Sequence, residues 1–176
     1  MTIAHVVLDR DGVLNIEDEA GGWVLTPQAF VWIPGALEAV RRLIAAGVHV
    51  SVATNQRCVA VGALSESELA AIHDKLRQDS GICAVYHCPH HSDAGCRCRK
   101  PGPQLLERAI HDSGVPLAST VFIGDAATDM QAATAAGIAG WLVRTGKGRD
   151  AEASPTPRVP VFADLSAAVD AVLERT

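Results

Sequence analysis

Two aspartates near the start of the chain have the spacing of a paired-carboxylate site. Asp9 and Asp11 directly follow an apolar run at 3–8, and Gly12 comes next. Side chains alternate along a strand, so both carboxylates leave its end on the same side. Carboxylates held that close repel one another unless a cation or a shared proton relieves them. The pair therefore offers a nucleophile, an acid/base group and half of a magnesium site.

A cluster of thiols and imidazoles forms the second group with recognisable chemistry. Cys88, His90, Cys96 and Cys98 lie within eleven residues of one another. Three thiolates and one imidazole suit a tetrahedral zinc ion, and His87 and His91 are the neighbouring alternatives to His90. Protein groups fill all four positions, so we expect a closed, structural Zn²⁺ site in a loop at about 88–98. Its expected job is to fix the segment that carries Arg99 and Lys100.

The elements that must position these groups are predicted by the pattern of apolar residues. Strand-like apolar runs alternate with helical patterns, which predicts one α/β domain over 1–176 with a parallel sheet of about five strands and helices on both faces. The strands are expected at 3–8, 48–53, 82–86, 120–123 and 141–143. The helices are expected at 35–47, from the capping box of Ser65 and Glu68, at 103–112, at 129–136 and from Asp164. The segments 15–33 and 151–160 are predicted to be irregular.

In open parallel sheets, ligands bind beyond the carboxyl ends of the strands. At those ends the chain carries Asp9 and Asp11, then Thr54, then the Cys/His loop, then Asp125. We therefore expect four polar clusters, far apart in sequence, to converge on one edge of the sheet.

Composition limits the classes of partner. The formal net charge is -5, and the chain has only three Trp, one Tyr and three Phe residues. Such a chain is poorly suited to a nucleic-acid groove or an acidic membrane surface. No apolar run approaches the roughly 20 residues that span a bilayer, and the start of the chain lacks a signal-peptide pattern. We expect a cytoplasmic monomer, whose five cysteines are thiols or metal ligands rather than disulfides.

The motifs at the strand ends resemble those of the haloacid dehalogenase (HAD) phosphohydrolases. Asp9-x-Asp11-Gly12-Val13, Thr54, Lys100 and Gly124-Asp125-x3-Asp129 match the four family signatures in order, through about Gly148. The resemblance implies a Rossmann-like HAD fold and magnesium-dependent transfer of a phosphoryl group to an aspartate. The chain has no room for a large cap domain, so we expect loops at 15–33, 57–64 and 88–100 to shape the pocket.

The resemblance also implies roles for the acidic residues. Asp9 would attack phosphorus and form an aspartyl phosphate. Asp11 would protonate the leaving oxygen and then deprotonate the attacking water. The Mg²⁺ ligands would be the Asp9 carboxylate, the Asp11 backbone carbonyl and Asp125, in keeping with the oxygen ligands that magnesium prefers.

The same resemblance implies roles for three further residues. Thr54 would donate a hydrogen bond to a phosphoryl oxygen. Lys100 would neutralise charge on the nucleophile and on the transferring group. Asp129 would orient Lys100 rather than bind metal. The alternative is that Asp129 only stabilises the first turn of its helix, where acidic residues interact favourably with the helix dipole.

The zinc loop narrows the resemblance within the family. The run C-P-H, the later C-x-C-R-K-P and the T-N-Q after the second strand are similar to two phosphatase groups. One group removes the 7-phosphate of D-glycero-D-manno-heptose 1,7-bisphosphate, and the other hydrolyses histidinol phosphate. The segments 23–32 and 142–148 look more like the heptose group. A bisphosphate has a second anionic end, for which the candidate counter-charges are Arg99, Arg144, Lys147 and Arg149.

One segment departs from the family pattern. After T-N-Q the family usually continues S-G-x-A-R-G, whereas this chain reads R-C-V-A-V-G at 57–62. Val61 takes the place of the expected arginine, and Arg57 is a candidate to restore the charge from another angle. An arginine at a new angle is rarely equivalent, so the identity of the substrate depends on this loop.

The predicted substrate-binding residues are Asn55, Gln56, Arg57, Arg99 and Glu17. Glu17 belongs to the acidic run 17–19, which could bind sugar hydroxyls or an ammonium group, or could form an exposed turn. The leading prediction for the whole chain is a phosphatase of a small phosphorylated sugar. Histidinol-phosphate hydrolysis, a zinc-stabilised binding module without catalysis, and a 3′-phosphatase of DNA ends are the alternatives.

Overall fold

Six parallel strands form the centre of the protein. The computed structural model describes residues 2–17, 22–154 and 158–176. Asp18 and Glu19 of the acidic run, and 155–157 of the proline-rich segment, lie outside the described residues. The strand order is β3-β2-β1-β4-β5-β6, and the strands are β1 (His5–Leu8), β2 (His49–Asn55), β3 (Ala84–Cys88), β4 (Thr120–Gly124), β5 (Ala139–Val143) and β6 (Val161–Phe162). All five predicted strands are present, which confirms the parallel α/β fold.

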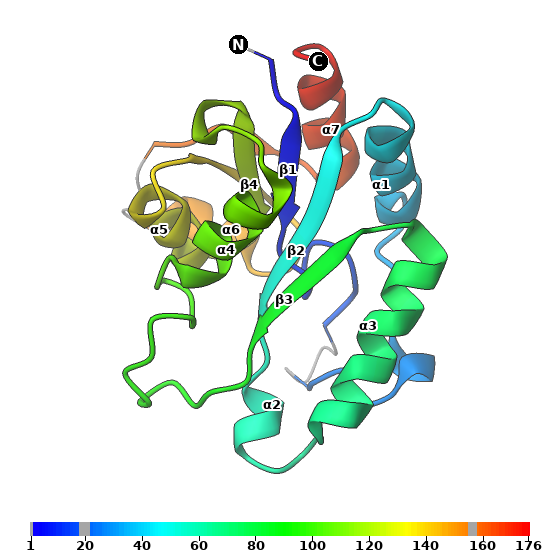
Figure 1. The fold of residues 1–176 in the computed structure, drawn as a ribbon, viewed down its shortest axis with the longest axis vertical. Coiled ribbons are helices and arrows are strands. Elements are labelled where there is room, and N and C mark those ends of the chain that lie inside the picture. Colours follow the sequence, from blue (N-terminus) through cyan, green and yellow to red (C-terminus); the bar gives the residue numbers. More distant parts are fainter. Residues whose placement is uncertain (1, 18–21, 155–157) are drawn as a thin grey trace.

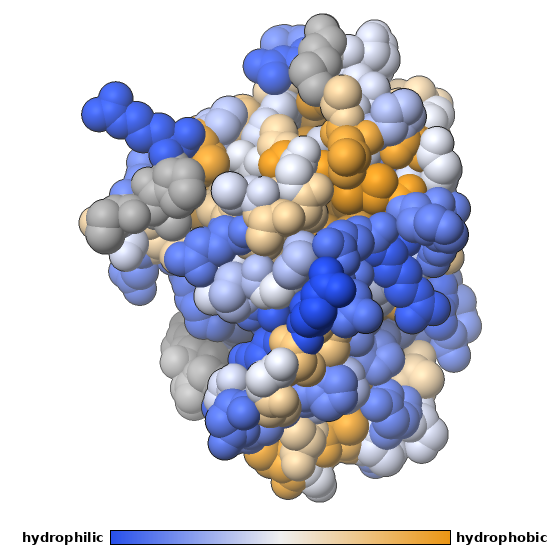
Figure 2. Space-filling view, turned by 60° about the vertical axis from the view of Figure 1, so that its left-hand side comes forward, coloured by the Kyte–Doolittle hydropathy of each residue, from blue (hydrophilic) through white to orange (hydrophobic). Residues whose placement is uncertain are grey.

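Helices cover both faces of the sheet (Figure 1). One face packs against α1 (Ala36–Ala45), α3 (Glu66–Ser80) and α7 (Leu165–Leu173), whose buried side chains share a core with the sheet. The other face packs against α4 (Gln104–Ser113), α5 (Ala127–Ala135) and α6 (Gly148–Ala153). Figure 2 brings this second helix layer forward and shows hydrophilic side chains over much of its outer surface.

Alternation along the central strand builds both cores at once. On β1, Val6 and Leu8 face the core under α1, α3 and α7, whereas Val7 faces the core under α4 and α5. All three side chains are fully buried. Burying a side chain of this size contributes about 1.5–3 kcal/mol. The central strand is thus a rigid base for the residues that follow it.

Local signals set the ends of the helices. The predicted capping box is present at α3, where Ser65 Oγ accepts from the Glu68 backbone N–H and Glu68 accepts from that of Ser65. Gly81, with a φ of 82°, ends the helix in the left-handed conformation. Asp164 caps α7 by accepting from the Ala167 backbone N–H at 2.9 Å.

The sequence pattern missed three short elements. A two-residue strand, β6, joins the edge of the sheet beside β5. The helices α2 (Arg57–Ala60) and α6 begin within segments that carry no amphipathic repeat. Such short elements show no measurable period, and tertiary contacts decide them. Two 3-10 turns, η1 (Pro27–Ala29) and η2 (Leu117–Ser119), complete the described elements. Within the described residues, the helices are too short or too polar for any of them to cross a membrane.

Candidate active site

A cavity of about 380 Å³ lies where the central strands end. Asp9 follows β1, Asp125 follows β4, and Asn55 is the last residue of β2. Lys100 lies at the end of the loop that follows β3. All four of these residues line the cavity. The predicted convergence at the carboxyl edge of the sheet is therefore present. The full lining consists of Asp9, Arg10, Asp11, Glu17, Gly22, Trp23, Thr54, Asn55, Arg57, Arg99, Lys100, Asp125, Ala126, Thr128, Asp129 and Lys147.

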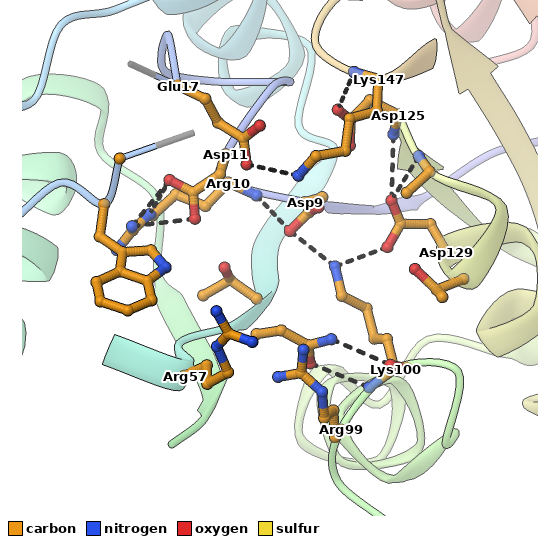
Figure 3. Close-up of a pocket in the computed structure, with 16 residues that line it drawn as sticks. Asp9, Arg10, Asp11, Glu17, Arg57, Arg99, Lys100, Asp125, Asp129 and Lys147 are labelled. Carbon is orange, nitrogen blue, oxygen red and sulfur yellow. Dashed lines mark hydrogen bonds and ion pairs between the residues drawn. The ribbon is translucent and has the colours of Figure 1, made fainter. Parts of the chain in front are cut away.

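Lys100 is buried between two carboxylates (Figure 3). Its Nζ lies 2.7 Å from Asp9 Oδ1 and 2.8 Å from Asp129 Oδ1. Burial disfavours the ammonium, but Asp129 and Asp9 outweigh that cost and raise the pKa of Lys100. The lysine is therefore a permanent cation beside the Asp9 carboxylate.

Asp129 holds this lysine in place. Its Oδ1 contacts Lys100, while its Oδ2 accepts from the backbone N–H groups of Asp125 and Ala126, at 3.2 and 3.0 Å. Both oxygens of Asp129 are thus engaged within the protein. The arrangement supports an orienting role for Asp129, although its carboxylate lies near those of Asp9 and Asp125.

Charge balance shows that the site fits a divalent cation. The ligand oxygens of Asp9, Asp125 and Asp129 all lie within 4.8 Å of one another, and Lys100 neutralises only one of the three charges. Burial, followed by the charge of Asp129, raises the pKa of Asp125 to about 7. Burial also raises the pKa of Asp9, although Lys100 opposes the shift. Buried carboxylate oxygens with an excess of two negative charges are a suitable environment for Mg²⁺.

Glycines make room for Asp125. Gly12 has a φ of +82°, and a Cβ added there would collide with the Asp125 carboxylate. A Cβ on Gly146, which has a φ of +53°, would collide with the same group. The Lys147 backbone N–H donates to Asp125 Oδ2 at 2.8 Å. Only glycine permits both turns to approach the carboxylate so closely.

Asp11 is turned toward a ring of donors instead of the three-carboxylate cluster. Its Oδ1 accepts from Arg10 Nη2 at 2.9 Å and from Asn15 Nδ2 at 3.0 Å. Its Oδ2 accepts from Gln56 Nε2 at 2.7 Å. Burial favours the neutral acid, but the Arg10 guanidinium and these hydrogen bonds together lower the pKa of Asp11. The carboxylate still lines the cavity, with 20% of its side chain exposed.

The last two residues of β2, Thr54 and Asn55, and the following Gln56 have different surroundings. Thr54 is buried, lines the cavity and accepts from Gln56 Nε2 at 2.9 Å. Asn55 makes a reciprocal pair with the Lys100 backbone, donating to its carbonyl at 3.1 Å and accepting from its N–H at 3.0 Å. Gln56 is not among the lining residues, and its amide instead joins Thr54 to Asp11. Gln56 thus supports the site from behind, whereas Asn55 lines the cavity and also fixes the Lys100 backbone.

Charged side chains surround the mouth of the cavity (Figure 3). The Arg57 guanidinium lies 5.5 Å from the centre of the Trp23 ring, and Arg99 lines the wall nearby. On the opposite side, Lys147 Nζ contacts Glu17 Oε1 at 2.9 Å. Each of the three loops expected to shape the pocket contributes at least one of these residues. Of the other candidate cations, neither Arg144 nor Arg149 lines the cavity, and Arg144 pairs with Glu152 at 2.7 Å.

The Cys/His loop forms a compact cluster of four ligands. Cys98 Sγ lies 3.1 Å from Cys88 Sγ, 3.5 Å from Cys96 Sγ and 3.1 Å from His90 Nδ1. Tetrahedral ligands about 2.3 Å from zinc lie roughly 3.7 Å apart, so the geometry fits a closed Zn²⁺ site. Of the alternatives to His90, His91 pairs with Asp93 and His87 with Glu66. Arg99 and Lys100 follow this cluster directly.

Sequence reasoning missed several residues of the site. Arg10 and Trp23 line the cavity, and Asn15 and His73 support it, but none of them was predicted. Arg10 stands between the two aspartates, which was an available signal. The position of His73, in the middle of α3, gives no such signal.

Comparisons with known proteins agree with this geometry. Residues 97–168 match the family of HAD-hydrolase-like proteins. The chain is 40% identical to the D-glycero-beta-D-manno-heptose-1,7-bisphosphate 7-phosphatase of Bordetella bronchiseptica, covering 96% of this chain and 97% of the relative. It is 37% identical to the protein of the same name from Pseudomonas aeruginosa, covering 99% and 100%.

Solved structures give the same result. The D,D-heptose 1,7-bisphosphate phosphatase of B. bronchiseptica, complexed with magnesium and phosphate, matches with a TM-score of 0.92 and 38% identity, covering 99% of this chain and all of that one. The corresponding enzyme of Burkholderia thailandensis matches with a TM-score of 0.73 and 31% identity, covering 96% and 97%.

Proposed function

Because this chain belongs to the HAD-like hydrolases, within the group of heptose-bisphosphate phosphatases, we propose that it removes the 7-phosphate of D-glycero-β-D-manno-heptose 1,7-bisphosphate. The observation that carries the proposal is the assembly of Asp9, Lys100 and Asp125 at one cavity, with Asp11 and Thr54 beside them. Each family motif thus contributes to a single site. The zinc-stabilised binding module without catalysis is disfavoured because this set is complete.

Asp9 is the proposed nucleophile. Its carboxylate is buried and fixed by the Arg10 backbone N–H at 2.7 Å and by Lys100. Attack on phosphorus by a carboxylate oxygen forms an aspartyl phosphate and releases the sugar alcohol, and water then hydrolyses the acyl phosphate. Two steps with lower barriers replace one difficult displacement.

The surrounding groups stabilise the transferring phosphoryl group. Lys100 lies within contact distance of the nucleophile and carries a fixed positive charge. The Thr54 hydroxyl borders the cavity and can donate to a phosphoryl oxygen. When bound by Asp9, Asp125 and the Asp11 carbonyl, Mg²⁺ supplies electrostatic stabilisation of the phosphoryl oxygens. Donors held in place before the reaction need no reorganisation during it.

Asp11 is the proposed general acid and base. It delivers a proton to the leaving sugar oxygen and later takes one from the attacking water. This role is supported by its carboxylate, which lines the same cavity as Asp9, two residues further along the chain.

The two arginines at the mouth support a bisphosphate as the substrate. Arg57 and Arg99 both line the cavity, and among the described residues no carboxylate forms an ion pair with either of them. By contrast, Arg97 and Arg144 pair with Glu107 and Glu152. Guanidinium groups that face a cavity without a counter-charge favour an anionic ligand. We propose that they bind the phosphate distal to the one removed, and that Glu17 binds a sugar hydroxyl.

The test is phosphate release with magnesium, measured side by side for both anomers of heptose 1,7-bisphosphate and for histidinol phosphate. We expect the highest kcat/KM for the β anomer, and Asp9→Asn should abolish turnover without unfolding the protein. Arg57→Gln should raise KM for the bisphosphate roughly tenfold and leave that for a monophosphate unchanged. A higher kcat/KM for histidinol phosphate would refute the substrate assignment and leave the phosphatase assignment standing.

Three further proposals concern the protein as a whole. We propose that 1–176 form a single domain, because the described helices pack against the two faces of one six-stranded sheet. We propose that the protein acts as a monomer, since the site is assembled within one chain. We also propose that it resides in the cytoplasm, where cysteines without disulfide bonds stay reduced and can bind zinc. The net charge of -5 disfavours DNA ends as substrates.

A further inference from the structure

A buried arginine lies directly behind the proposed acid/base residue. Arg10 is 1% exposed, although guanidinium groups are seldom buried without partners. Its Nε and Nη2 donate to Asp11 Oδ1 at 3.2 and 2.9 Å, and Nη2 also reaches Asp11 Oδ2 at 3.0 Å. The rigid fork of the guanidinium therefore fixes the plane of the Asp11 carboxylate.

The same arginine also orients Gln56. Arg10 Nη2 lies 3.1 Å from Gln56 Oε1. Because arginine only donates, the amide oxygen must face it, and the amide nitrogen then points the other way. That nitrogen donates to Asp11 Oδ2 at 2.7 Å and to Thr54 Oγ1 at 2.9 Å. Arg10 thus couples the orientation of Asp11 to that of the Thr54 hydroxyl.

The outer end of Arg10 is anchored by a histidine. Nη1 lies 3.3 Å from Nε2 of His73, a buried residue in the middle of α3. Burial, followed by the neighbouring Arg10 charge, lowers the pKa of His73 to about 3. The neutral ring accepts through Nε2 and carries its proton on Nδ1. A core helix outside the motif loops therefore holds the guanidinium in place.

We propose that Arg10, anchored by His73, is the positioning residue that aims Asp11 at the leaving oxygen of the substrate. Neither residue needs to touch the substrate for this role. The inference rests on the proposed function, because it assumes that Asp11 protonates the departing alcohol. If Arg10 has this role, its loss should lower kcat/KM most for substrates whose leaving group needs a proton in order to depart.

Leaving-group dependence tests the proposal. A sugar alkoxide needs a proton to depart, whereas acetyl phosphate releases acetate, which is stable as an anion. For both substrates kcat/KM reports steps up to leaving-group departure and not the later hydrolysis. We expect Arg10→Met to lower kcat/KM for heptose bisphosphate about 100-fold, which is within the range that general acid catalysis contributes. The same variant should lower kcat/KM for acetyl phosphate less than about threefold, because acetate departs without a proton.

The variants are chosen to separate positioning from folding. The Arg10 backbone N–H bond to Asp9 persists in any side-chain variant. His73→Leu should lower kcat/KM for the sugar substrate about tenfold with the same selectivity, and it carries the test should Arg10→Met fail to fold. His5→Gln is the matched control, since His5 is equally buried but lies at the opposite end of β1. It should affect both substrates by the same factor.

Equal losses for the two substrates in Arg10→Met and His73→Leu would overturn the proposal, as would no loss for either. Failure of the proposed function is distinguishable from this result. If the wild-type protein does not hydrolyse heptose bisphosphate, β-glycerophosphate serves as the alkyl phosphate, and the same comparison with acetyl phosphate still decides the role of Arg10.

Discussion

Replacing Lys100 with methionine should destabilise the protein as well as inactivate it. The ammonium lies 2.7 Å from Asp9 and 2.8 Å from Asp129, and the lysine side chain is 2% exposed. Removing one partner of a buried ion pair costs about 3–5 kcal/mol, because the remaining charge is left uncompensated. For a chain of 176 residues, each kcal/mol lowers Tm by about 2–4 °C. We therefore expect Lys100→Met to lower Tm by roughly 6–20 °C.

Thermal unfolding measures Tm and urea unfolding measures the free energy of unfolding, both at pH 7.5 in buffer with zinc present and magnesium omitted. Lys75→Met is the matched control, because Lys75 contacts Asp79 at the same 2.7 Å but is 35% exposed. An exposed pair of this kind contributes less than about 1 kcal/mol. If the two variants lose equal free energy of unfolding, the argument from burial is wrong.

Three other predictions test separate parts of the structure. Gly12→Ala should reduce phosphate release at least about 100-fold through its collision with Asp125, whereas Gly47→Ala, at a φ of +78° with nothing nearby, should cost only stability. Cys96→Ser should lower the zinc content measured by mass spectrometry, and Cys83→Ser, outside the cluster, should not. Burial, followed by the charge of His49, lowers the pKa of His5 to about 4. As the pH falls, His5 is therefore protonated in the unfolded state before it is protonated in the folded state. Its contribution to the free energy of unfolding decreases between about pH 6.5 and pH 4, by up to about 1.4 kcal/mol per pH unit. Urea unfolding of His5→Gln should show a correspondingly shallower pH dependence than the wild type, and identical slopes would contradict it.

The sequence predicted the parts of the site that chemistry constrains tightly. Asp9, Thr54 and Asp125 could be placed because each follows an apolar strand, and parallel strands end at one edge. The zinc ligands could be placed because thiol and imidazole spacing is itself diagnostic. In both cases the signal is local, so one sequence sufficed to locate the groups.

What the sequence could not predict depends on packing between distant segments. Gln56 was predicted to bind substrate, but its amide turns inward toward the Arg10 guanidinium. The partner of that guanidinium, His73, is 63 residues away along the chain. Likewise, Arg144 lay in a promising basic run, yet it pairs with Glu152 outside the cavity. Side-chain direction in such cases is set by neighbours that no sequence pattern specifies.

Charge balance connects the stability of the site to its chemistry. When all four are ionised, the aspartates at positions 9, 11, 125 and 129 carry four negative charges, and the cations paired with them, Arg10 and Lys100, supply two positive ones. A magnesium ion would neutralise this local excess of two, and without it burial raises the pKa of Asp9 and of Asp125. A ligand that binds only the folded state stabilises it, so the cation that supports phosphoryl transfer also relieves repulsion among the carboxylates. The carboxylates that lower the stability of the folded state when no cation is bound are therefore the same ones that support phosphoryl transfer when a cation is bound.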